Sequence, residues 1–369
     1  QHRQRDARYT ILTADPVAVT RLDSAVFGQN PMDPVREWQS SLPAIPDAEQ
    51  ESLPPFCGGI AGLMSYELGQ SFERIPCPAI DDFKTPALLA GLFDWAIVWD
   101  HIAGTVRQYV LRLHNCKIQR QDRVAWIDER LSQGGKLNSA DPCPVASVLR
   151  PFTSTPPCYQ IEPSSEVYSD FTRDQYTAAV ARIIEYIRAG DIFQANLSQR
   201  LSAPWSGTSM QLYASVRTNN PAPFCGFLKA NDFSVISASP ERFLKVDRSR
   251  RVETRPIKGT RRRPRSAIAD LYAGAELSSS EKDRAENVMI VDLLRNDISR
   301  SCKPGTVKVT GLCEVERFET VLHLVSTVVG TLRDDCDVWN LMAGCFPGGS
   351  ITGAPKIRAM EIIAELEPG

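Results

Sequence analysis

RVETRPIKGTRRRPR, residues 251–265, predicts a strand that presents one lysine among several arginines. Side chains alternate along its first half, which places Val252 and Thr254 on one face. Lys258 falls on that same face at the end of the strand, and Gly259 then allows the chain to turn. An ammonium group crowded by like charges loses its proton more easily, and this is one way to make a lysine nucleophilic.

The chain as a whole is nearly neutral, which limits the roles open to the basic stretch. It has 369 residues, with 42 Lys or Arg against 44 Asp or Glu and a net charge of −2. This balance argues against nucleic acid and membrane surfaces as partners. A phosphate-binding patch and a solvated loop stay open as alternatives. The hydrophobic content of 43% is enough for a large core and about two domains.

No segment has the features of a membrane anchor or of a secreted scaffold. The longest apolar stretch, residues 87–99, is interrupted by Asp94 and is too short to span a bilayer. No signal peptide is recognisable, and the ten cysteines include no C-x-x-C pair. The pattern therefore predicts reduced thiols in the cytoplasm, without a zinc site or a disulfide framework.

Composition divides the chain into three parts. Residues 1–137 mix strands, including a hairpin within 96–113, with a glycine-rich apolar stretch at 56–69. Residues 138–169 contain six scattered prolines and are predicted to be a linker. In residues 170–369, strands follow one another in runs with few helices between them. This order favours an α+β fold with largely antiparallel sheets over a doubly wound α/β fold.

The third part is predicted to begin with a capped helix. Thr172 and Gln175 form a capping box, and Gly190 ends the helix. Its apolar face consists of Tyr176, Val180, Ile183, Ile184 and Ile187. Residues 192–201 then alternate as a strand, with Phe193, Ala195, Leu197 and Leu201 on one side and Gln194, Asn196, Ser198 and Arg200 on the other. Further strands are predicted at 9–13, 233–238, 251–257, 306–312 and 321–330.

Residues 280–297 predict a helix with two carboxylates near its start. Ser280 is a suitable N-cap, and Asp283 and Glu286 share a face at positions i and i+3. Carboxylate oxygens in this arrangement are suited to one hard cation. The alternative is structural, because acidic residues near a helix N-terminus also favour the helix dipole.

Glu241 and His323 are the other titratable candidates. Glu241 follows closely on the strand predicted at 233–238. A carboxyl beside a pocket acts as a general acid if burial raises its pKa, whereas a solvated turn residue is the alternative. His323 interrupts the apolar alternation of the last predicted strand. It is either a satisfied core histidine or a polar contact to a substrate.

FPGGSITGAPK, residues 346–356, predicts a glycine-rich loop that enters a helix. Backbone N–H groups at such an entry bind a carboxylate or a phosphate. The spacing matches neither the P-loop nor the dinucleotide-binding pattern. Gly348, Gly349 and Gly353 are weak signals by themselves, because turns also require glycine.

Taken together, these stretches resemble the chorismate-utilising enzymes, and within that family the aminodeoxychorismate synthase component I branch. They occur in the order that the family has, over most of the chain and most strongly from about residue 171 onward. The matching stretches are FCGGIAGLMSYELGQSFE (56–73), SASPERF (237–243), ETRPIKGTRRR (253–263), KDRAENVMIVDLLRND (282–297), HLVSTVVG (323–330) and FPGGSITGAPKIRAMEII (346–363). The resemblance implies an α+β fold of two largely antiparallel sheets packed as a sandwich, with helices outside.

Two positions indicate the reaction within the family. The resemblance implies that Lys258, where anthranilate synthases usually carry alanine, attacks C2 of chorismate and forms a covalent intermediate. Gln194 stands where water-adding relatives carry a lysine, which favours ammonia as the incoming nucleophile. The expected product is 4-amino-4-deoxychorismate, the precursor of 4-aminobenzoate in folate biosynthesis.

The resemblance also implies the roles of the site residues. Glu241 is expected to act as the general acid/base that helps the C4 hydroxyl leave, and Asp283 and Glu286 are expected to bind Mg²⁺ as the cofactor. Arginines 261–263 are expected to make Lys258 easier to deprotonate. The residues expected to contact chorismate are His323, Gly259, Thr260, Ser350, Thr352 and Gly353.

Partners and chain ends follow from the same resemblance. Ammonia is expected from a glutamine amidotransferase subunit, because the chain shows no Cys-His-Glu constellation of its own. The family has a tryptophan pocket between its sheets, for which the candidates by position are Arg8, Tyr9, Pro223 and Phe224. Family members normally begin earlier and continue past the position of Gly369, so the chain is expected to be truncated at both ends and poorly active by itself.

Two other functions stay open at this point. Anthranilate synthase component I shares most of the motifs and would release fluorescent anthranilate. A non-catalytic regulator that binds chorismate or tryptophan is the second alternative, and it would bind an amino acid without turning over chorismate.

Overall fold

The computed structural model describes residues 7–45, 53–77, 80–81, 83–114, 120–133, 158–162, 164–318 and 321–368. Helices and antiparallel strands occur there in separate runs, which confirms the α+β class. The helices are α2 (Asp33–Gln39), α4 (Arg120–Gln133), α5 (Arg173–Ala189), α6 (Ser209–Asn219), α7 (Ala267–Ser279), α8 (Glu281–Ser299), α9 (Val338–Cys345) and α10 (Lys356–Leu366), with 3-10 turns η1 (Tyr66–Ser71) and η3 (Gly349–Ile351).

The strands are short in the first half of the chain and longest near its end. They are β1 (Tyr9–Leu12), β2 (Ala18–Leu22), β3 (Gly59–Met64), β4 (Leu88–Phe93), β5 (Trp95–Asp100), β6 (Thr105–Val110), β7 (Tyr159–Gln160), β8 (Tyr168–Ser169), β9 (Gln194–Ala195), β10 (Leu201–Ser202), β11 (Phe224–Lys229), β12 (Ser234–Ser239), β13 (Arg242–Val246), β14 (Arg251–Arg255), β15 (Ile257–Arg262), β16 (Lys308–Arg317), β17 (Val321–Thr331) and β18 (Gly353–Ala354).

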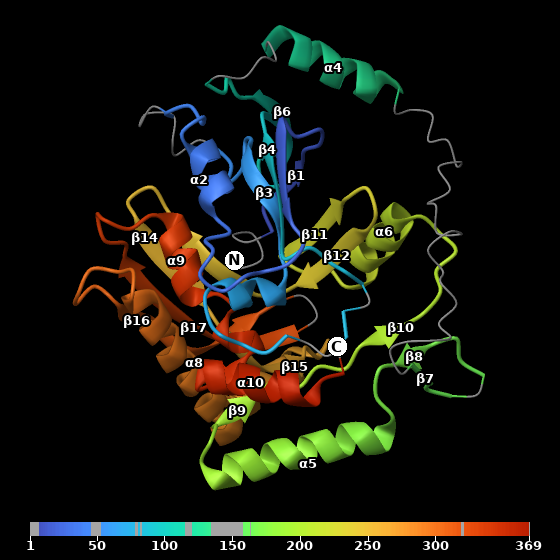
Figure 1. The fold of residues 1–369 in the computed structure, drawn as a ribbon, viewed down its shortest axis with the longest axis vertical. Coiled ribbons are helices and arrows are strands. Elements are labelled where there is room, and N and C mark those ends of the chain that lie inside the picture. The colour runs from blue at the N-terminus through green and yellow to red at the C-terminus, as the bar shows by residue number, and fades with distance from the viewer. Residues whose placement is uncertain are drawn as a thin grey trace.

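Two three-stranded sheets form the N-terminal part. Their strand orders are β2-β4-β3 and β1-β5-β6. The hairpin predicted within 96–113 is confirmed as β5 and β6, which pair antiparallel. The apolar stretch 87–99 supplies β4 and β5 and is largely buried. In Figure 1 this part lies above the longer strands and helices of the C-terminal half, and α4 and α5 lie at opposite ends of the molecule.

β17 is the central strand of the largest sheet. It pairs with β14 and β15 along one edge and with β16 along the other. Its side chains Leu322, Leu324 and Val328 are completely buried. Helix α8 packs across this sheet with Ile290 and Ile298 also at 0% exposure. The helix predicted at 280–297 is therefore confirmed, with Ser280 as its N-cap.

Pro256 divides the strand that the sequence predicts at 251–257. β14 ends before it and β15 begins after it, because proline has no N–H to donate to the ladder. Both pieces pair with β17, so the direction of the strand continues across the break. The carbonyl of Pro256 still accepts a hydrogen bond from the N–H of Ser326 at 3.1 Å.

Gly259 forms a bulge where the sequence predicts a turn. Ile257 lies opposite Val325 and Thr260 lies opposite His323, so three residues along β15 match two along β17. Gly259 has φ +78, the left-handed conformation that glycine adopts without strain. The pairing with β17 keeps one register from Arg251 to Ile257 and shifts only at the bulge between Ile257 and Thr260. The predicted common face of Lys258 with Val252 and Thr254 stays a prediction.

Helix α5 shows the predicted ends but only part of the predicted apolar face. The capping box is present, and Gly190 ends the helix at φ +82. Ile183 is 7% exposed, whereas Ile184 and Ile187 are 42% and 39% exposed. The difference arises because the helix lies at the edge of the molecule (Figure 1), where a single narrow stripe packs against α10.

The strand predicted at 192–201 is mostly irregular backbone. Only β9 and β10 are paired, with β18 and β8 respectively, and each has two residues. Phe193 and Leu201, which alternation places on the apolar side, are 74% and 58% exposed. The partner β18 is too short to hold a longer ladder, and Asn196 N–H instead bonds the carbonyl of Thr352 at 2.8 Å.

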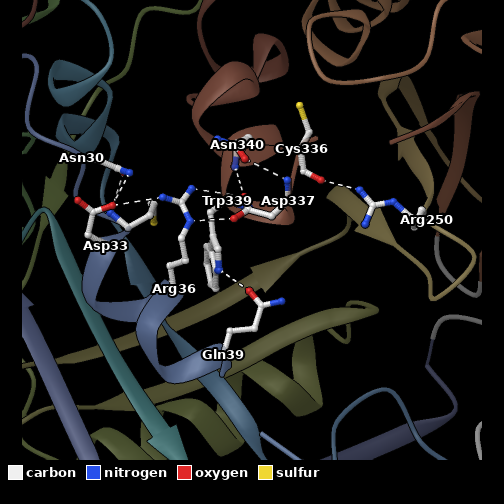
Figure 2. A network of polar contacts seen from close by, with 10 residues as sticks. Asn30, Asp33, Arg36, Gln39, Arg250, Cys336, Asp337, Trp339 and Asn340 are labelled. Carbon is white, nitrogen blue, oxygen red and sulfur yellow. Dashed lines mark hydrogen bonds and ion pairs between the residues drawn. The ribbon is translucent and has the colours of Figure 1, made fainter. Parts of the chain in front are cut away.

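The N-terminal part is fixed to the C-terminal half through α2 and α9. Arg36 Nε donates to Asp337 Oδ2 at 2.8 Å, and Trp339 Nε1 donates to Gln39 Oε1 at 2.9 Å (Figure 2). Trp339 also packs against the apolar cluster that surrounds Met32. Because α9 leads directly into the glycine-rich loop, these contacts support the loop from one side.

Only the last part of the predicted linker belongs to the described residues. The linker prolines 142, 144, 151, 156, 157 and 163 lie outside them. Within 158–169, β7 and β8 join β10 in a three-stranded sheet. The division into 1–137, 138–169 and 170–369 stays a prediction. In the described part of the chain, no helix combines the length and the apolar character needed to cross a membrane.

Candidate active site

Lys258 is held at the bulge of β15 and points to the glycine-rich loop. Its Nζ donates to the backbone carbonyl of Ser350 at 3.2 Å. The lysine is partly buried. A bulge re-aims the side chains of its strand, and this one turns a primary amine toward a loop that is 92 residues away in the sequence.

Glu241 lies on the other side of the same serine. The Ser350 hydroxyl donates to Glu241 Oε1 at 2.7 Å, and the N–H of Ile257 donates to the same oxygen at 3.3 Å. Burial raises the pKa of Glu241, and these donors together with the charge of Lys258 offset only part of that effect. One serine therefore touches a primary amine through its carbonyl and a carboxyl through its hydroxyl, which is the pairing that a nucleophile and a general acid require.

The glycine-rich loop is shaped by its own hydrogen bonds and by Asn196. Thr352 is completely buried, and its hydroxyl donates to the carbonyl of Gly348 at 3.2 Å, so it shapes the loop. Asn196 Nδ2 donates to the carbonyl of Ser350 at 3.0 Å and thereby shares this acceptor with the lysine. Asn196 was not predicted as a site residue, and its only signal in the sequence was its place on the polar side of 192–201.

Gln194 lies beside this loop, and the buried oxygen of its side-chain amide, Oε1, has no hydrogen-bond partner among the described residues. Its Nε2 approaches Asn196 Oδ1 at 3.5 Å. The backbone of Gln194 pairs with Ala354, which places the side chain next to the loop that holds Ser350. A buried amide oxygen without a partner is costly unless it serves a ligand or water.

His323 and Thr260 form a second polar pair. The Thr260 hydroxyl and His323 Nδ1 are 2.9 Å apart across the two paired strands. His323 is 6% exposed, and the ring of Phe318 packs edge-on against it with 5.2 Å between centroids. Burial lowers the pKa of His323, so its imidazole is neutral at pH 7. The two residues lie side by side on paired strands, and contact of His323 with chorismate stays a prediction.

Asp283, the first of the two candidate carboxylates of α8, lies next to the bulge. A Cβ placed on Gly259 would be 2.9 Å from Cβ of Asp283, so glycine permits the close approach of strand and helix. Asp283 accepts a hydrogen bond from Arg261 Nη2 at 3.0 Å. Glu286, one turn further, is half-buried and forms no hydrogen bond or ion pair with the rest of the described chain.

These carboxylates fit a magnesium ion in their chemistry but supply only part of a site. Both side chains offer hard oxygen donors. Asp283 already forms an ion pair with Arg261, so its carboxylate can interact with a cation. No group of three or more His, Cys, Asp or Glu side chains suited to a metal occurs within the described ranges. Asp283 and Glu286 would therefore hold Mg²⁺ together with water or substrate oxygens.

The arginine run is balanced by carboxylates. Arg255 pairs with Glu316, Arg261 with Asp283, and Arg263 Nε with Asp270 at 3.0 Å. The sequence alone suggested uncompensated crowding around the lysine, but distant acidic residues meet several of these cations. The influence of arginines 261–263 on Lys258 accordingly stays a prediction.

The residues predicted for the tryptophan pocket do not all line one cavity. Pro223 and Phe224 line a small cavity, together with Pro240, Arg242, Arg255, Ile257, Glu316, Phe318 and Val325. Arg8 pairs with Asp100 at 2.6 Å and lies 4.9 Å from the ring of Tyr9, and neither Arg8 nor Tyr9 lines that cavity. Ile257 and Pro240 place the cavity directly behind the segments that carry Lys258 and Glu241.

Comparison with known proteins identifies the family. Residues 2–369 match the model of the chorismate binding enzymes. The chain is 37% identical to aminodeoxychorismate synthase component 1 of Salmonella typhimurium, covering 98% of this chain and 75% of that protein. It is also 37% identical to anthranilate synthase component 1 of Thermus thermophilus, covering 99% and 76%.

Solved structures agree at the level of the fold. Anthranilate synthase component I from Streptococcus pneumoniae superposes with a TM-score of 0.77 at 29% identity, covering 98% of this chain and 78% of that one. The menaquinone-specific isochorismate synthase of Escherichia coli has a TM-score of 0.64 at 15% identity, covering 99% and 72%. The second likeness shows the fold alone.

Proposed function

This chain belongs to the chorismate binding enzymes, and on that premise we propose that it converts chorismate and ammonia to 4-amino-4-deoxychorismate. Its relatives include aminodeoxychorismate synthase component 1 and anthranilate synthase component 1 at the same 37% identity, so overall similarity does not choose between these reactions. The choice rests on the residues of the site. A catalytic role is supported over that of a non-catalytic regulator, because the relatives are enzymes.

The contact chain from Lys258 through Ser350 to Glu241 carries the proposal. Lys258 Nζ and Glu241 Oε1 bond to the carbonyl and the hydroxyl of one residue, at 3.2 and 2.7 Å. A lysine that only supported the fold would not need a carboxyl with raised pKa beside it. The pair supplies an amine to attack the ring and a proton for the group that leaves.

The first step forms a bond between the lysine and the ring. The neutral amine of Lys258 attacks C2 of chorismate, the two ring double bonds shift, and the C4–O bond breaks. The protonated carboxyl of Glu241 gives its proton to the departing hydroxyl, which leaves as water. A pKa raised by burial keeps Glu241 protonated to a higher pH than an exposed glutamate.

The second step installs the new amine. Ammonia forms a bond to C4, the double bonds return, and the bond between C2 and the lysine nitrogen breaks. The proton that ammonia loses is accepted by the Glu241 carboxylate, which restores the acid. Mg²⁺ held at Asp283 and Glu286 would neutralise the carboxylate of the ring. Gln194, with its partnerless amide oxygen, favours ammonia as the nucleophile because it offers no base to activate water.

The partners follow from the chemistry of the second step. Ammonia at neutral pH is mostly ammonium, which is not a nucleophile, so a glutamine amidotransferase subunit is the proposed source. The product would serve 4-aminobenzoate and folate biosynthesis. The proposed tryptophan site comprises Pro223 and Phe224, which line the small cavity, with Arg8 and Tyr9 as its further candidates.

Mass spectrometry of the protein tests the covalent step. Incubation with chorismate and Mg²⁺ without ammonia should add the ring to a peptide that contains Lys258, with loss of one water. Lys258→Ala should remove the adduct and reduce amination at least a hundredfold. Lys245→Ala, at an exposed lysine of β13, is the matched control and should retain both. Equal turnover of the two variants would refute the covalent role.

Anthranilate formation is the second candidate because the Thermus thermophilus relative carries that name. Product analysis separates the two reactions, since anthranilate is fluorescent and is released together with pyruvate. With chorismate, ammonia and Mg²⁺, the proposal expects a product that keeps the enolpyruvyl group. Fluorescent anthranilate as the main product would overturn it.

A further inference from the structure

Arg261 is shared between two carboxylates at the edge of the site. Its Nη2 donates to Asp283 Oδ2 at 3.0 Å, and its Nε donates to Glu276 Oε1 at 3.2 Å. Its Nη1 donates to the carbonyl of Thr260 at 3.2 Å. One guanidinium thus bridges the last turns of α7 and the first turn of α8.

The two carboxylates differ in their exposure to solvent. The side chain of Asp283 is 14% exposed and that of Glu276 is 69% exposed. Charge interactions are stronger where water is excluded, so the contact with Asp283 is the more consequential of the two. Guanidinium also keeps its charge at every relevant pH, so the contact is not relieved by deprotonation.

We propose that Arg261 competes with the divalent ion for Asp283, and that Glu276 retains the arginine when the ion prevails. The inference rests on the proposed binding of Mg²⁺ at Asp283 and Glu286. Nη2 donates to Asp283 Oδ2 at 3.0 Å, so the arginine occupies a carboxylate oxygen that would otherwise be available to the ion. A guanidinium and a divalent ion at one carboxylate repel each other, so binding of one weakens binding of the other.

Asp283 has little freedom to serve both cations by turning away. Its Cβ packs against Gly259 so closely that a methyl group there would lie 2.9 Å from it. Its backbone N–H is fixed by the Ser280 cap at 3.3 Å. Arg261, by contrast, has two further bonds, to Glu276 and to the Thr260 carbonyl, which remain if the contact with Asp283 is given up. The arginine is therefore the movable partner.

Titration with Mn²⁺ followed by electron paramagnetic resonance tests the competition without measuring turnover. The free Mn²⁺ signal gives the dissociation constant of the purified protein and its variants in the absence of chorismate. Arg261→Gln should bind Mn²⁺ about three- to tenfold more tightly. Arg262→Gln removes the same charge from the next residue, which is exposed, and is the matched control. It should change the affinity by less than about twofold.

Glu276→Gln gives a prediction of the opposite sign. Without its second carboxylate, Arg261 stays on Asp283, so Mn²⁺ should bind about two- to threefold more weakly than to the unaltered protein. This variant lies on the surface of α7 and should leave the fold intact, since the side chain of Glu276 is 69% exposed. Circular dichroism should confirm that all variants remain folded.

The outcomes separate this inference from the proposed metal site. If Glu286→Gln does not reduce Mn²⁺ binding, the proposed site itself is wrong and the competition with it. If Glu286→Gln abolishes binding but Arg261→Gln and Arg262→Gln have the same affinity, the site stands and the competition is refuted. Weaker binding by Arg261→Gln would also refute the competition, because the arginine would then support Asp283 as a ligand.

Discussion

Lys356 Nζ lies 2.7 Å from Asp297 Oδ2 in a nearly closed environment, with the two side chains 12% and 1% exposed. The same ammonium donates to the carbonyl of Cys345 at 3.0 Å and of Pro347 at 3.3 Å. It therefore ties α8, the helix of the two candidate metal ligands, to the start of the loop that carries Ser350. Burial raises the pKa of Asp297, and Lys356 offsets part of that effect.

Removing Lys356 should be strongly destabilising. In Lys356→Met the carboxylate of Asp297 is left buried without its counter-ion, and this should cost about 3–5 kcal/mol of unfolding free energy at pH 7. The cost should shrink as the pH falls, because Asp297 can then be protonated at less expense. Urea denaturation at pH 5 and pH 7 measures both effects.

An exposed ion pair of similar length provides the control for that variant. Lys303 Nζ lies 2.9 Å from Asp334 Oδ1, but these side chains are 42% and 81% exposed. Lys303→Met should therefore cost no more than about 1 kcal/mol. Equal unfolding free energies for Lys356→Met and Lys303→Met would show that burial does not strengthen the ion pair of Lys356 and Asp297.

Two glycines with the same backbone angle separate conformational strain from crowding. Gly259 has φ +78 and Gly305 has φ +76. A methyl group on Gly305 would meet no atom within 4 Å, whereas one on Gly259 would lie 2.9 Å from Asp283 Cβ. Gly305→Ala should cost about 1–2 kcal/mol from the backbone alone. Gly259→Ala should cost clearly more and should also displace Asp283, so Mn²⁺ affinity should fall.

The variants Gly259→Ala and Gly305→Ala could also behave alike. If Gly259→Ala and Gly305→Ala lose the same stability and Gly259→Ala binds Mn²⁺ normally, the close approach of β15 to α8 does not position the carboxylate. Thermal unfolding and the Mn²⁺ titration together decide this.

Local sequence patterns predicted the elements of the fold where neighbouring residues determine them. The capping box and glycine stop of α5, the Ser280 cap of α8 and the long strand at 321–330 are all confirmed. The exposed Ile184 and the irregular 192–201 segment were not predictable, because each depends on how much partner surface other parts of the chain supply.

The site was predictable as a set of residues but not as a set of contacts. Resemblance selected Lys258, Glu241 and Ser350, yet Ser350 lies 92 and 109 residues from the other two. The pairing of Arg261 with Asp283 was also not visible, since the sequence shows a run of like charges and not the acids that meet them. The bulge between Ile257 and Thr260 was likewise not visible, because a register shift depends on the partner strand β17.

Glu241→Gln should stabilise the protein in a pH-dependent way. A raised folded pKa means that ionisation is harder in the folded state than in the unfolded chain, where the pKa is about 4.5. The protonated Glu241 carboxyl therefore contributes its whole share of the unfolding free energy below pH 4.5. This contribution is lost as the pH rises through the folded pKa. Glutamine does not ionise, so the melting temperature of the variant relative to the unaltered protein should increase from pH 4.5 upward and then level off.

The same variant should lose activity. Without an ionisable acid, amination of chorismate should fall by about a hundredfold to ten-thousandfold. Gain of stability and loss of turnover in one substitution would mark Glu241 as a group whose burial serves catalysis. A melting-temperature difference that narrows as the pH rises would contradict the direction of its pKa shift.

Asp337 offers a test of how α2 supports the helix that leads into the loop. Its Oδ1 accepts the N–H groups of Trp339 and Asn340 at 3.0 and 2.8 Å, and its Oδ2 accepts from Arg36 (Figure 2). Burial opposes the charge, but Arg36 and the backbone donors hold the pKa of Asp337 below its ordinary value. The ionised Asp337 carboxylate therefore stabilises the folded protein above about pH 3.8, and this contribution is lost as the pH falls through the folded pKa.

Asparagine at position 337 removes the ion pair with Arg36, whereas alanine removes both the ion pair and the helix cap. Asp337→Asn keeps an oxygen for the helix N-cap but loses the charge that Arg36 meets, which should cost about 0.5–1 kcal/mol in urea denaturation. Asp337→Ala also loses the cap and should cost about 1–2 kcal/mol more. Arg36→Met breaks the same ion pair and also the exposed contact of Arg36 Nη1 with Asp33 Oδ1 at 3.3 Å, so it should cost as much as the asparagine variant or slightly more. If Arg36→Met were as costly as Asp337→Ala, the contact between α2 and α9 would outweigh the cap, and the N-terminal part would be the main support of the loop that holds Ser350.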